Sequence, residues 1–164
     1  MNKPHIILAA DHAGFTLKEK VKSHLQKGGY EVLDVGAHEL VETDDYPVYM
    51  AQAGLKVAED MDGNTKAIIF GSTGQGEAMV ANRFPGVRAT VWYGSAHKPF
   101  VDASGNSLDI IQSSREHNNA NILSIGARMV DEESAIEAID MWLTIPFNGD
   151  ERHARRNELI DNIE

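Results

Sequence analysis

The sequence contains no cysteine, and none of its apolar runs approaches the length of a membrane span. Without cysteine, the chain has neither a disulfide framework nor a thiolate for catalysis or metal binding. A spanning helix needs roughly 18 to 20 apolar residues in a row, so no membrane partner is expected. The chain enters a strand-like run directly after its N-terminus and shows no signal peptide, which predicts a cytoplasmic protein.

Basic residues are also in the minority. The chain has 15 Lys and Arg against 25 Asp and Glu, for a formal net charge of -10. Such an acidic chain is poorly suited to the phosphate backbone of nucleic acids, so no nucleic-acid partner is expected. An anionic substrate would instead need a local cationic pocket. The 164 residues, 42% of them hydrophobic, are enough for one domain with its own core, and we expect residues 1–164 to form it.

What the chain does contain is an alternation of short apolar runs and amphipathic stretches. The apolar runs predict five strands, at 5–10, 30–35, 67–70, 87–92 and 120–125. Helices are predicted at 15–25, 44–58, 78–83 and 134–143, with an extra one near the C-terminus at 152–163. Strands that alternate with helices are typical of a parallel sheet covered on both faces. The sequence therefore predicts an α/β fold, a three-layer α/β/α Rossmann-like sandwich.

The stretch 68–77 joins the third strand to a helix through a loop rich in glycine and hydroxyl side chains. Three glycines let backbone N–H groups converge on an anion or on a developing oxyanion. Glu77 stands where the helix begins, and it either complements the helix dipole or acts as a catalytic base. The alternative for the loop is tight packing between strand and helix, without a ligand.

Further polar residues follow two other strands. Asp11 and His12 come after the first strand, and Arg128 comes after the fifth. Because ligands of parallel sheets bind beyond the carboxyl ends of the strands, these residues are expected to share one edge with the glycine loop. Asp11 and His12 can alternatively cap a helix, and Arg128 can form a surface ion pair.

Two more candidates lie nearer the C-terminus. His117 and Asn118 precede the fifth strand, where they form either a functional pair or a plain polar turn. Arg152 and Arg156 are four residues apart and share one helix face, which can hold a phosphate or be solvated. The seven histidines are scattered without a close pattern of carboxylates, so no metal site is expected.

Together these segments resemble the family of type B ribose-5-phosphate isomerase and its relative galactose-6-phosphate isomerase. The matching segments occur in the family's order and cover almost the whole chain; they are 10–15, 45–47, 71–77, 81–83, 88–89, 117–118, 126–128 and 152–153. The resemblance implies an aldose–ketose isomerase of a phosphorylated sugar, by default D-ribose 5-phosphate to D-ribulose 5-phosphate. It also implies that the reaction uses no cofactor and no metal.

The resemblance further implies a role for each matching side chain. Some family members carry a cysteine base at the start of the loop, where this chain has Gly71, and others use a glutamate at its end, which Glu77 matches. His117 resembles the residue that opens the sugar ring, while Asn118 and Thr73 resemble residues that stabilise the enediolate. The residues that match positions for the sugar and its phosphate are Asp11, His12, Tyr46, Gly71, Ser72, Gly74, Gln75, Gly76, Arg128, Arg152 and Arg156.

Several points stay open at this stage. The segment 97–112 is the least regular part of the chain and is longer than in compact family members. It can form a loop or short helix that selects the sugar, or a solvated insertion without effect. Alternatives are therefore another four- or six-carbon sugar phosphate as substrate, or a non-catalytic phosphate- or nucleotide-binding module. The resemblance also implies a homodimer or dimer of dimers whose site lies at the subunit interface, with His117 and the glycine loop contributed by different subunits.

Overall fold

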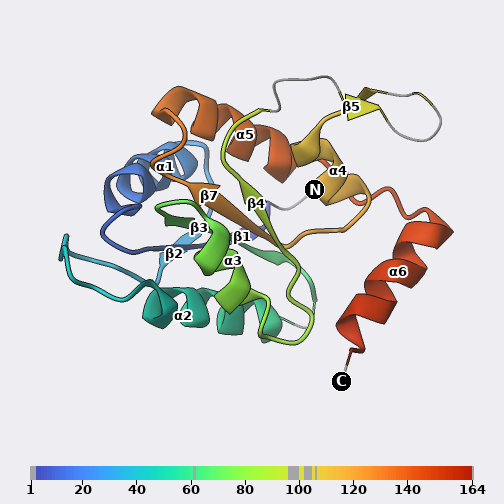
Figure 1. Ribbon diagram of the computed structural model, residues 1–164, viewed down its shortest axis with the longest axis horizontal. Coiled ribbons are helices and arrows are strands. Elements are labelled where there is room, and N and C mark those ends of the chain that lie inside the picture. The colour runs from blue at the N-terminus through green and yellow to red at the C-terminus, as the bar shows by residue number, and fades with distance from the viewer. Residues whose placement is uncertain (1–2, 61, 96–99, 102–104, 106, 164) are drawn as a thin grey trace.

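A computed structural model describes residues 3–163 except 61, 96–99, 102–104 and 106 (Figure 1). Five strands form one sheet in which every neighbouring pair is parallel, in the order β2-β1-β3-β7-β4. They are β1 (His5–Ala10), β2 (Val32–Asp34), β3 (Thr65–Gly71), β4 (Ala89–Trp92) and β7 (Ile122–Gly126). The predicted parallel sheet is thus confirmed, with strand ends that differ from the prediction by up to two residues.

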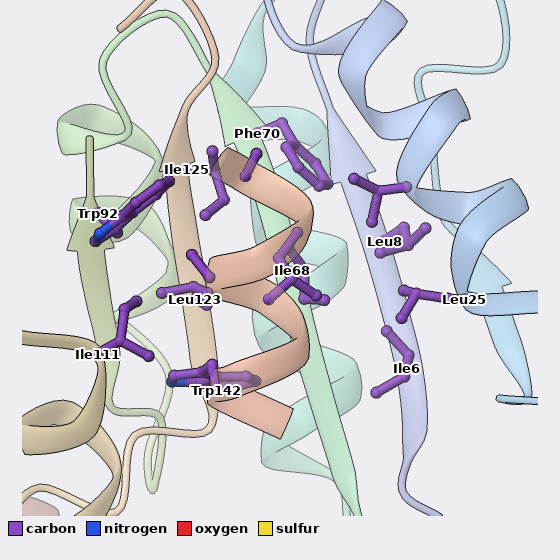
Figure 2. Close-up of a cluster of buried hydrophobic side chains, with 14 of the residues drawn as sticks. Ile6, Leu8, Leu25, Ile68, Phe70, Trp92, Ile111, Leu123, Ile125 and Trp142 are labelled. Carbon is purple, nitrogen blue, oxygen red and sulfur yellow. The ribbon is translucent and has the colours of Figure 1, made fainter. Parts of the chain in front are cut away.

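Helices cover both faces of this sheet. On one face lie α1 (Phe15–Lys27), α4 (Ile110–Glu116) and α5 (Glu132–Thr144), and on the other lie α2 (Tyr46–Ala58) and α3 (Gln75–Ala81). Successive side chains of a strand point to opposite faces, so Ile6 and Leu8 pack under the first group of helices and Ile7 under the second. Figure 2 shows the first of these two cores, built around Trp92 and Trp142. Burial on both faces explains why the strands read as continuous apolar runs.

The last helix, α6 (Glu151–Asp161), stands apart from the three layers (Figure 1). Its buried side attaches to the body through Asn157, whose Nδ2 donates to the carbonyl oxygen of His117 at 3.2 Å. At its C-terminal end, both carboxylate oxygens of Asp161 accept from Arg88 at 2.7 Å. The extra C-terminal helix is confirmed, and it is tied to the loop before β7. Among the described residues, no helix is long and apolar enough to cross a membrane.

The segment 97–112 is more regular than the sequence indicates. In its described part, β5 (Phe100–Val101) pairs antiparallel with β6 (Ser107–Leu108), and α4 follows at once. Asp109 caps α4 by accepting from the N–H groups of Ile111 and Gln112. The sequence left a loop or a short helix open for this segment, and a short helix, α4, begins within it at Ile110. His97, Pro99 and Asn106 lie outside the described residues.

A buried lysine fixes the end of β2 and the loop that follows it. The side chain of Lys18 is fully buried, and its Nζ donates to both oxygens of Asp34, at 2.8 and 2.7 Å, and to the carbonyl oxygen of Ala37 at 2.7 Å. Burial alone would raise the pKa of Asp34, but hydrogen bonds from Lys18, Lys22 and the Gly36 N–H outweigh it and lower that pKa below its usual range. The pair thereby ties α1 to the chain that leads into α2.

We expect the substitution Lys18→Met to lower the free energy of unfolding by about 3 kcal/mol, since removal of one partner leaves the buried Asp34 carboxylate poorly compensated. Urea unfolding measures the change, and Lys20→Met on the exposed face of the same helix serves as the control. The pKa of Asp34 is lower in the folded state than in the unfolded state. The contribution of Asp34 to the free energy of unfolding is therefore complete above its unfolded-state pKa, and it is lost as the pH falls through its folded-state pKa. The difference in the free energy of unfolding between wild type and Lys18→Met should therefore decrease at acidic pH. A difference that stays constant with pH would contradict this role of the ion pair.

Candidate functional site

Polar residues gather where β1, β3 and β7 end, as the sequence predicts. Asp11 and His12 follow β1, the loop 71–76 and Glu77 follow β3, and Arg128 follows β7. Tyr46, the first residue of α2, reaches the same place, because its phenolic oxygen lies 2.7 Å from where a Cβ at Gly76 would stand. We call these residues together the carboxyl-edge cluster.

The loop of this cluster is fixed through its carbonyl groups. The carbonyl oxygens of Gly71 and Ser72 accept from the N–H groups of Ala127 and Arg128, at 2.8 and 3.2 Å. The hydroxyl of Ser124 donates to the carbonyl oxygen of Gly74 at 2.7 Å. Within the described part of the chain, the N–H groups of Ser72 and Thr73 donate to no acceptor. The loop therefore presents free donors, which is the arrangement expected for an anion or an oxyanion.

Glu77 is buried in this loop, with a relative exposure of 5%. A Cβ on Gly71 would lie 1.7 Å from its Oε1 and 2.2 Å from its Cδ. The carboxylate thus occupies the space that any side chain at position 71 would need. Glycine is required there by this close approach, and the identities of the two positions depend on each other.

The surroundings of Glu77 change the pKa of its carboxyl group. Burial raises the pKa of its carboxyl group above the usual range, and the negative charge of Asp11 raises it further. The backbone N–H groups of Glu77 and Gly74 oppose this rise by hydrogen bonding to the carboxylate. A buried carboxylate with a raised pKa, next to free N–H donors, is suited to take up and return a proton.

His12 is held by a carboxylate that the sequence reading did not single out. Asp44 Oδ1 lies 3.0 Å from the backbone nitrogen of His12 and 2.7 Å from its Nδ1. Asp11 uses its own Oδ1 to accept from the N–H groups of Ala13 and Gly14. Asp11 therefore stabilises the turn before α1, as the capping alternative proposed, but the N-cap residue of α1 is Gly14.

In the part of the chain that the structure describes, Asp11, His12 and Asp44 are the one group of side chains close enough to hold a metal ion. Their potential ligand atoms lie within 4.8 Å of one another. The 2.7 Å separation between His12 Nδ1 and Asp44 Oδ1 is that of a hydrogen bond, so these two atoms are paired with each other. Arg128 is exposed, and among the described residues its guanidinium forms no ion pair.

A second group of candidates lies around His117. Its ring stacks on that of His153 from α6, with centroids 4.2 Å apart and planes 7° apart. The hydroxyl of Ser113 lies 3.1 Å from His117 Nδ1. Burial lowers the pKa of His153, and the charges of His117 and Arg152 lower it further. We call His117, Asn118, Arg152 and Arg156 the amino-edge cluster, because His117 and Asn118 lie before the first residue of β7.

Two arginines that sequence reasoning did not assign to the site hold this turn. Arg88 donates through Nε to the carbonyl oxygen of Asn118 at 3.0 Å. The buried Arg115 donates to Asn119 and Ala120, and burial lowers its pKa to about 10. The sequence analysis placed Arg88 within a strand predicted at 87–92 and within a segment that matches the family, but neither signal indicated its contact with the turn before β7. Arg152 and Arg156 themselves are exposed on α6.

The two clusters lie at opposite edges of the sheet. Gly71 pairs with Gly126 at the carboxyl end of β7, whereas Ala67 donates to Asn121 just before its amino end. The five residues of β7 separate the two levels by about 13 Å along the strand. One chain therefore brings together Asp11, His12, Tyr46, the loop, Glu77 and Arg128, but it does not bring His117, Asn118, Arg152 or Arg156 to them.

Comparison with known proteins places this chain among sugar isomerases. A family profile described as Ribose/Galactose Isomerase matches residues 6–160. The chain is 38% identical to ribose-5-phosphate isomerase B of Escherichia coli, over 97% of this chain and 95% of that protein. It is 34% identical to ribose-5-phosphate isomerase B of Mycolicibacterium paratuberculosis, over 97% of this chain and 91% of that one.

Solved structures agree with the sequence comparison. The crystal structure of ribose-5-phosphate isomerase B from Mycoplasma genitalium with bound ribulose-5-phosphate has a TM-score of 0.81 and 31% identity, and covers 96% of this chain and 93% of that one. The isomerase from Thermotoga maritima has a TM-score of 0.82 and 34% identity, with 99% of this chain and 100% of that one covered.

The dependence between positions 71 and 77 is testable by a double-mutant cycle. We expect Gly71→Ala to lower the free energy of unfolding by about 1–3 kcal/mol, because its methyl group collides with the Glu77 carboxylate. In the background of Glu77→Ala, which empties that space, the same substitution should cost at least about 1 kcal/mol less. Chemical denaturation of the four proteins measures the coupling. Strictly additive effects would show that the two residues do not compete for space.

Proposed function

This chain belongs to the ribose/galactose isomerase family, and we propose that it interconverts D-ribose 5-phosphate and D-ribulose 5-phosphate. The observation that carries the proposal is the buried Glu77 carboxylate, with its raised pKa, set into a loop of free N–H donors. Isomerisation of an aldose needs a base that moves a proton between neighbouring carbons and donors that stabilise the enediolate between the two transfers. The ribulose-5-phosphate bound to the Mycoplasma genitalium relative supports this substrate pair.

In the proposed reaction, His117 first opens the sugar ring by taking the proton of the anomeric hydroxyl while the ring oxygen is protonated. Glu77 then removes the proton from C2 of the open chain. The electrons of that C–H bond form the C1–C2 double bond, and the aldehyde oxygen takes up the negative charge. Thr73, Asn118 and the free N–H groups of the loop stabilise this oxygen. Return of the proton from Glu77 to C1, with transfer of the O2 proton to O1, gives the ketose.

The phosphate group is proposed to bind His12, Arg128, Arg152 and Arg156. Guanidinium groups match the geometry of phosphate oxygens and hold them through paired hydrogen bonds. Contacts to the phosphate act far from the reacting carbons, so their binding energy fixes C1 and C2 against Glu77. Asp11 and Tyr46 are proposed to bind sugar hydroxyls, together with Gly71, Ser72, Gly74, Gln75 and Gly76 of the loop.

The complete site is proposed to form between two copies of the chain, in a homodimer or a dimer of dimers. The separation of the carboxyl-edge and amino-edge clusters by the length of β7 supports this, because one sugar phosphate does not reach both edges of one sheet. A two-fold dimer would create two equivalent sites, each with one cluster from either subunit. The reaction is proposed to need no metal or cofactor and to take place in the cytoplasm.

The direct experiment is to follow ketose formation from D-ribose 5-phosphate by purified protein in the presence of EDTA. Four- and six-carbon aldose phosphates, assayed in parallel, test the alternative substrates, for which the segment 97–112 is a proposed determinant. Formation of D-ribulose 5-phosphate, with a higher kcat/KM than for the other sugars, supports the proposal. A protein that binds these sugars but converts none would be the non-catalytic phosphate-binding module, for which the buried Glu77 has no evident use.

We expect Glu77→Gln to lower kcat by roughly a hundredfold or more and to leave KM within several-fold, the usual result of losing a general base. The same change at the exposed Glu59 is the matched control and should leave both constants unchanged. In the wild type, kcat/KM should fall as the pH decreases through the raised pKa of Glu77, above the 4.5 of an ordinary glutamate, because the base is active only as the carboxylate. Near-normal turnover of Glu77→Gln would assign the base elsewhere.

Mixed dimers test the composite site. Glu77→Gln and His117→Ala subunits, coexpressed with different tags and purified through both, should regain about half of the wild-type turnover per dimer, because one of the two sites then receives both intact residues. Each variant alone should be nearly inactive. If both residues of a site came from one subunit, every site of the mixed dimer would carry a defect, and the mixed dimers would stay as inactive as their parents.

A further inference from the structure

The buried carboxylate of Asp44 is hydrogen-bonded to His12. The Asp44 side chain is only 6% exposed, and its Oδ1 binds both the backbone nitrogen and Nδ1 of His12, at 3.0 and 2.7 Å. Its Oδ2 is buried without a hydrogen-bond partner among the described residues. Burying a carboxylate with one oxygen left unpaired costs free energy, so we expect its hydrogen bonds to His12 to serve a function.

We propose that Asp44 is the positioning residue for His12, fixing the ring so that Nε2 faces the phosphate of the substrate. This inference rests on the proposed function, in which His12 is a phosphate ligand. It goes beyond the family resemblance, whose matching segment begins one residue later, at Asp45.

The chemistry of the contact decides which nitrogen is available. A carboxylate only accepts hydrogen bonds, so Nδ1 must carry the proton that it donates to Asp44, and Nε2 is the nitrogen left for a ligand. When the ring carries its second proton, Nε2–H donates to a phosphate oxygen. The backbone N–H of His12 donates to the same Oδ1 and so fixes the main chain as well. Phosphate binding then loses less conformational entropy, because the main chain is already ordered.

The charged and titratable groups that the structure places around this pair fit the assignment. Asp11 Oδ2 lies 3.8 Å from His12 Nδ1, farther than Asp44 Oδ1 and beyond hydrogen-bond distance. Tyr49 of α2 lies near Asp44, and burial, followed by the charge of Asp44, raises the pKa of its phenol. Asp44 is thus the carboxylate that bonds the ring, while Asp11 remains engaged with the turn before α1.

The neighbouring Asp45 offers a matched control. It is exposed and precedes α2 as the N-cap residue, but its side chain makes no capping hydrogen bond. The substitutions Asp44→Asn and Asp45→Asn therefore remove the same charge from adjacent positions, and only the first removes the carboxylate that holds His12.

Steady-state kinetics with D-ribose 5-phosphate separate positioning from general damage. We expect Asp44→Asn to raise KM by about tenfold, the scale of one hydrogen bond to a charged group, with kcat within about threefold. The effect falls on KM because the phosphate is bound alike in the ground and transition states. Asp45→Asn should change neither constant. An unchanged KM in Asp44→Asn, or an equal rise in both variants, would overturn the proposal.

Ring-nitrogen NMR tests the same contact without catalysis. In the wild type, the ¹⁵N spectrum of His12 should show Nδ1 protonated, and titration with inorganic phosphate should shift the Nε2 resonance. In Asp44→Asn, the phosphate dissociation constant should rise by about tenfold. A wild-type His12 with an unprotonated Nδ1 would overturn the proposal, whether or not the variant folds. If the wild type isomerises no sugar phosphate, the proposed function fails, while the spectrum still decides the role of Asp44.

Discussion

The five strands of the central sheet run parallel, and this fixes where the polar residues of the molecule can gather. Because every strand runs the same way, residues that follow β1, β3 and β7 must meet at one edge, and residues that precede β4 and β7 must meet at the other. The carboxyl-edge cluster and the amino-edge cluster are the result. A site that needs residues of both edges is incomplete in one chain, which is why the proposed site draws on two copies.

Within the carboxyl edge, the chemistry depends on the absence of one side chain. Gly71 leaves open the volume that the Glu77 carboxylate fills, which removes this carboxylate from water and raises its pKa. The carbonyl oxygens of Gly71, Ser72 and Gly74 accept hydrogen bonds from β7 and the residues after it, while the N–H groups of Ser72 and Thr73 have no acceptor among the described residues. The proposed base and the proposed oxyanion donors therefore both depend on how this one loop is packed.

Much of this was predictable from the sequence, because strong local signals carried it. The apolar runs placed the five strands. For the glycine loop, the sequence offered an anion site or tight packing between strand and helix, and at Gly71 the structure shows close packing against the Glu77 side chain. The hairpin of β5 and β6 was not predicted, and α4 was expected only as a loop or short helix without bounds, because two-residue strands and a seven-residue helix leave no clear periodicity. Asp44 was missed because its importance comes from a contact with His12, 32 residues away in the chain, which no local pattern records.

We propose that proton transfer through an enediolate, with Glu77 as the base, carries the isomerisation without a metal. The most direct test is to convert D-ribose 5-phosphate with the wild-type protein in D₂O containing EDTA and to analyse the product by NMR. After many rounds of interconversion we expect solvent deuterium at C1 of D-ribulose 5-phosphate, because the proton on a carboxylate can exchange with water before it is returned. A product that still lacks deuterium after many rounds would indicate direct transfer of hydride between the two carbons, in which Glu77 takes up no proton, and would contradict the proposal.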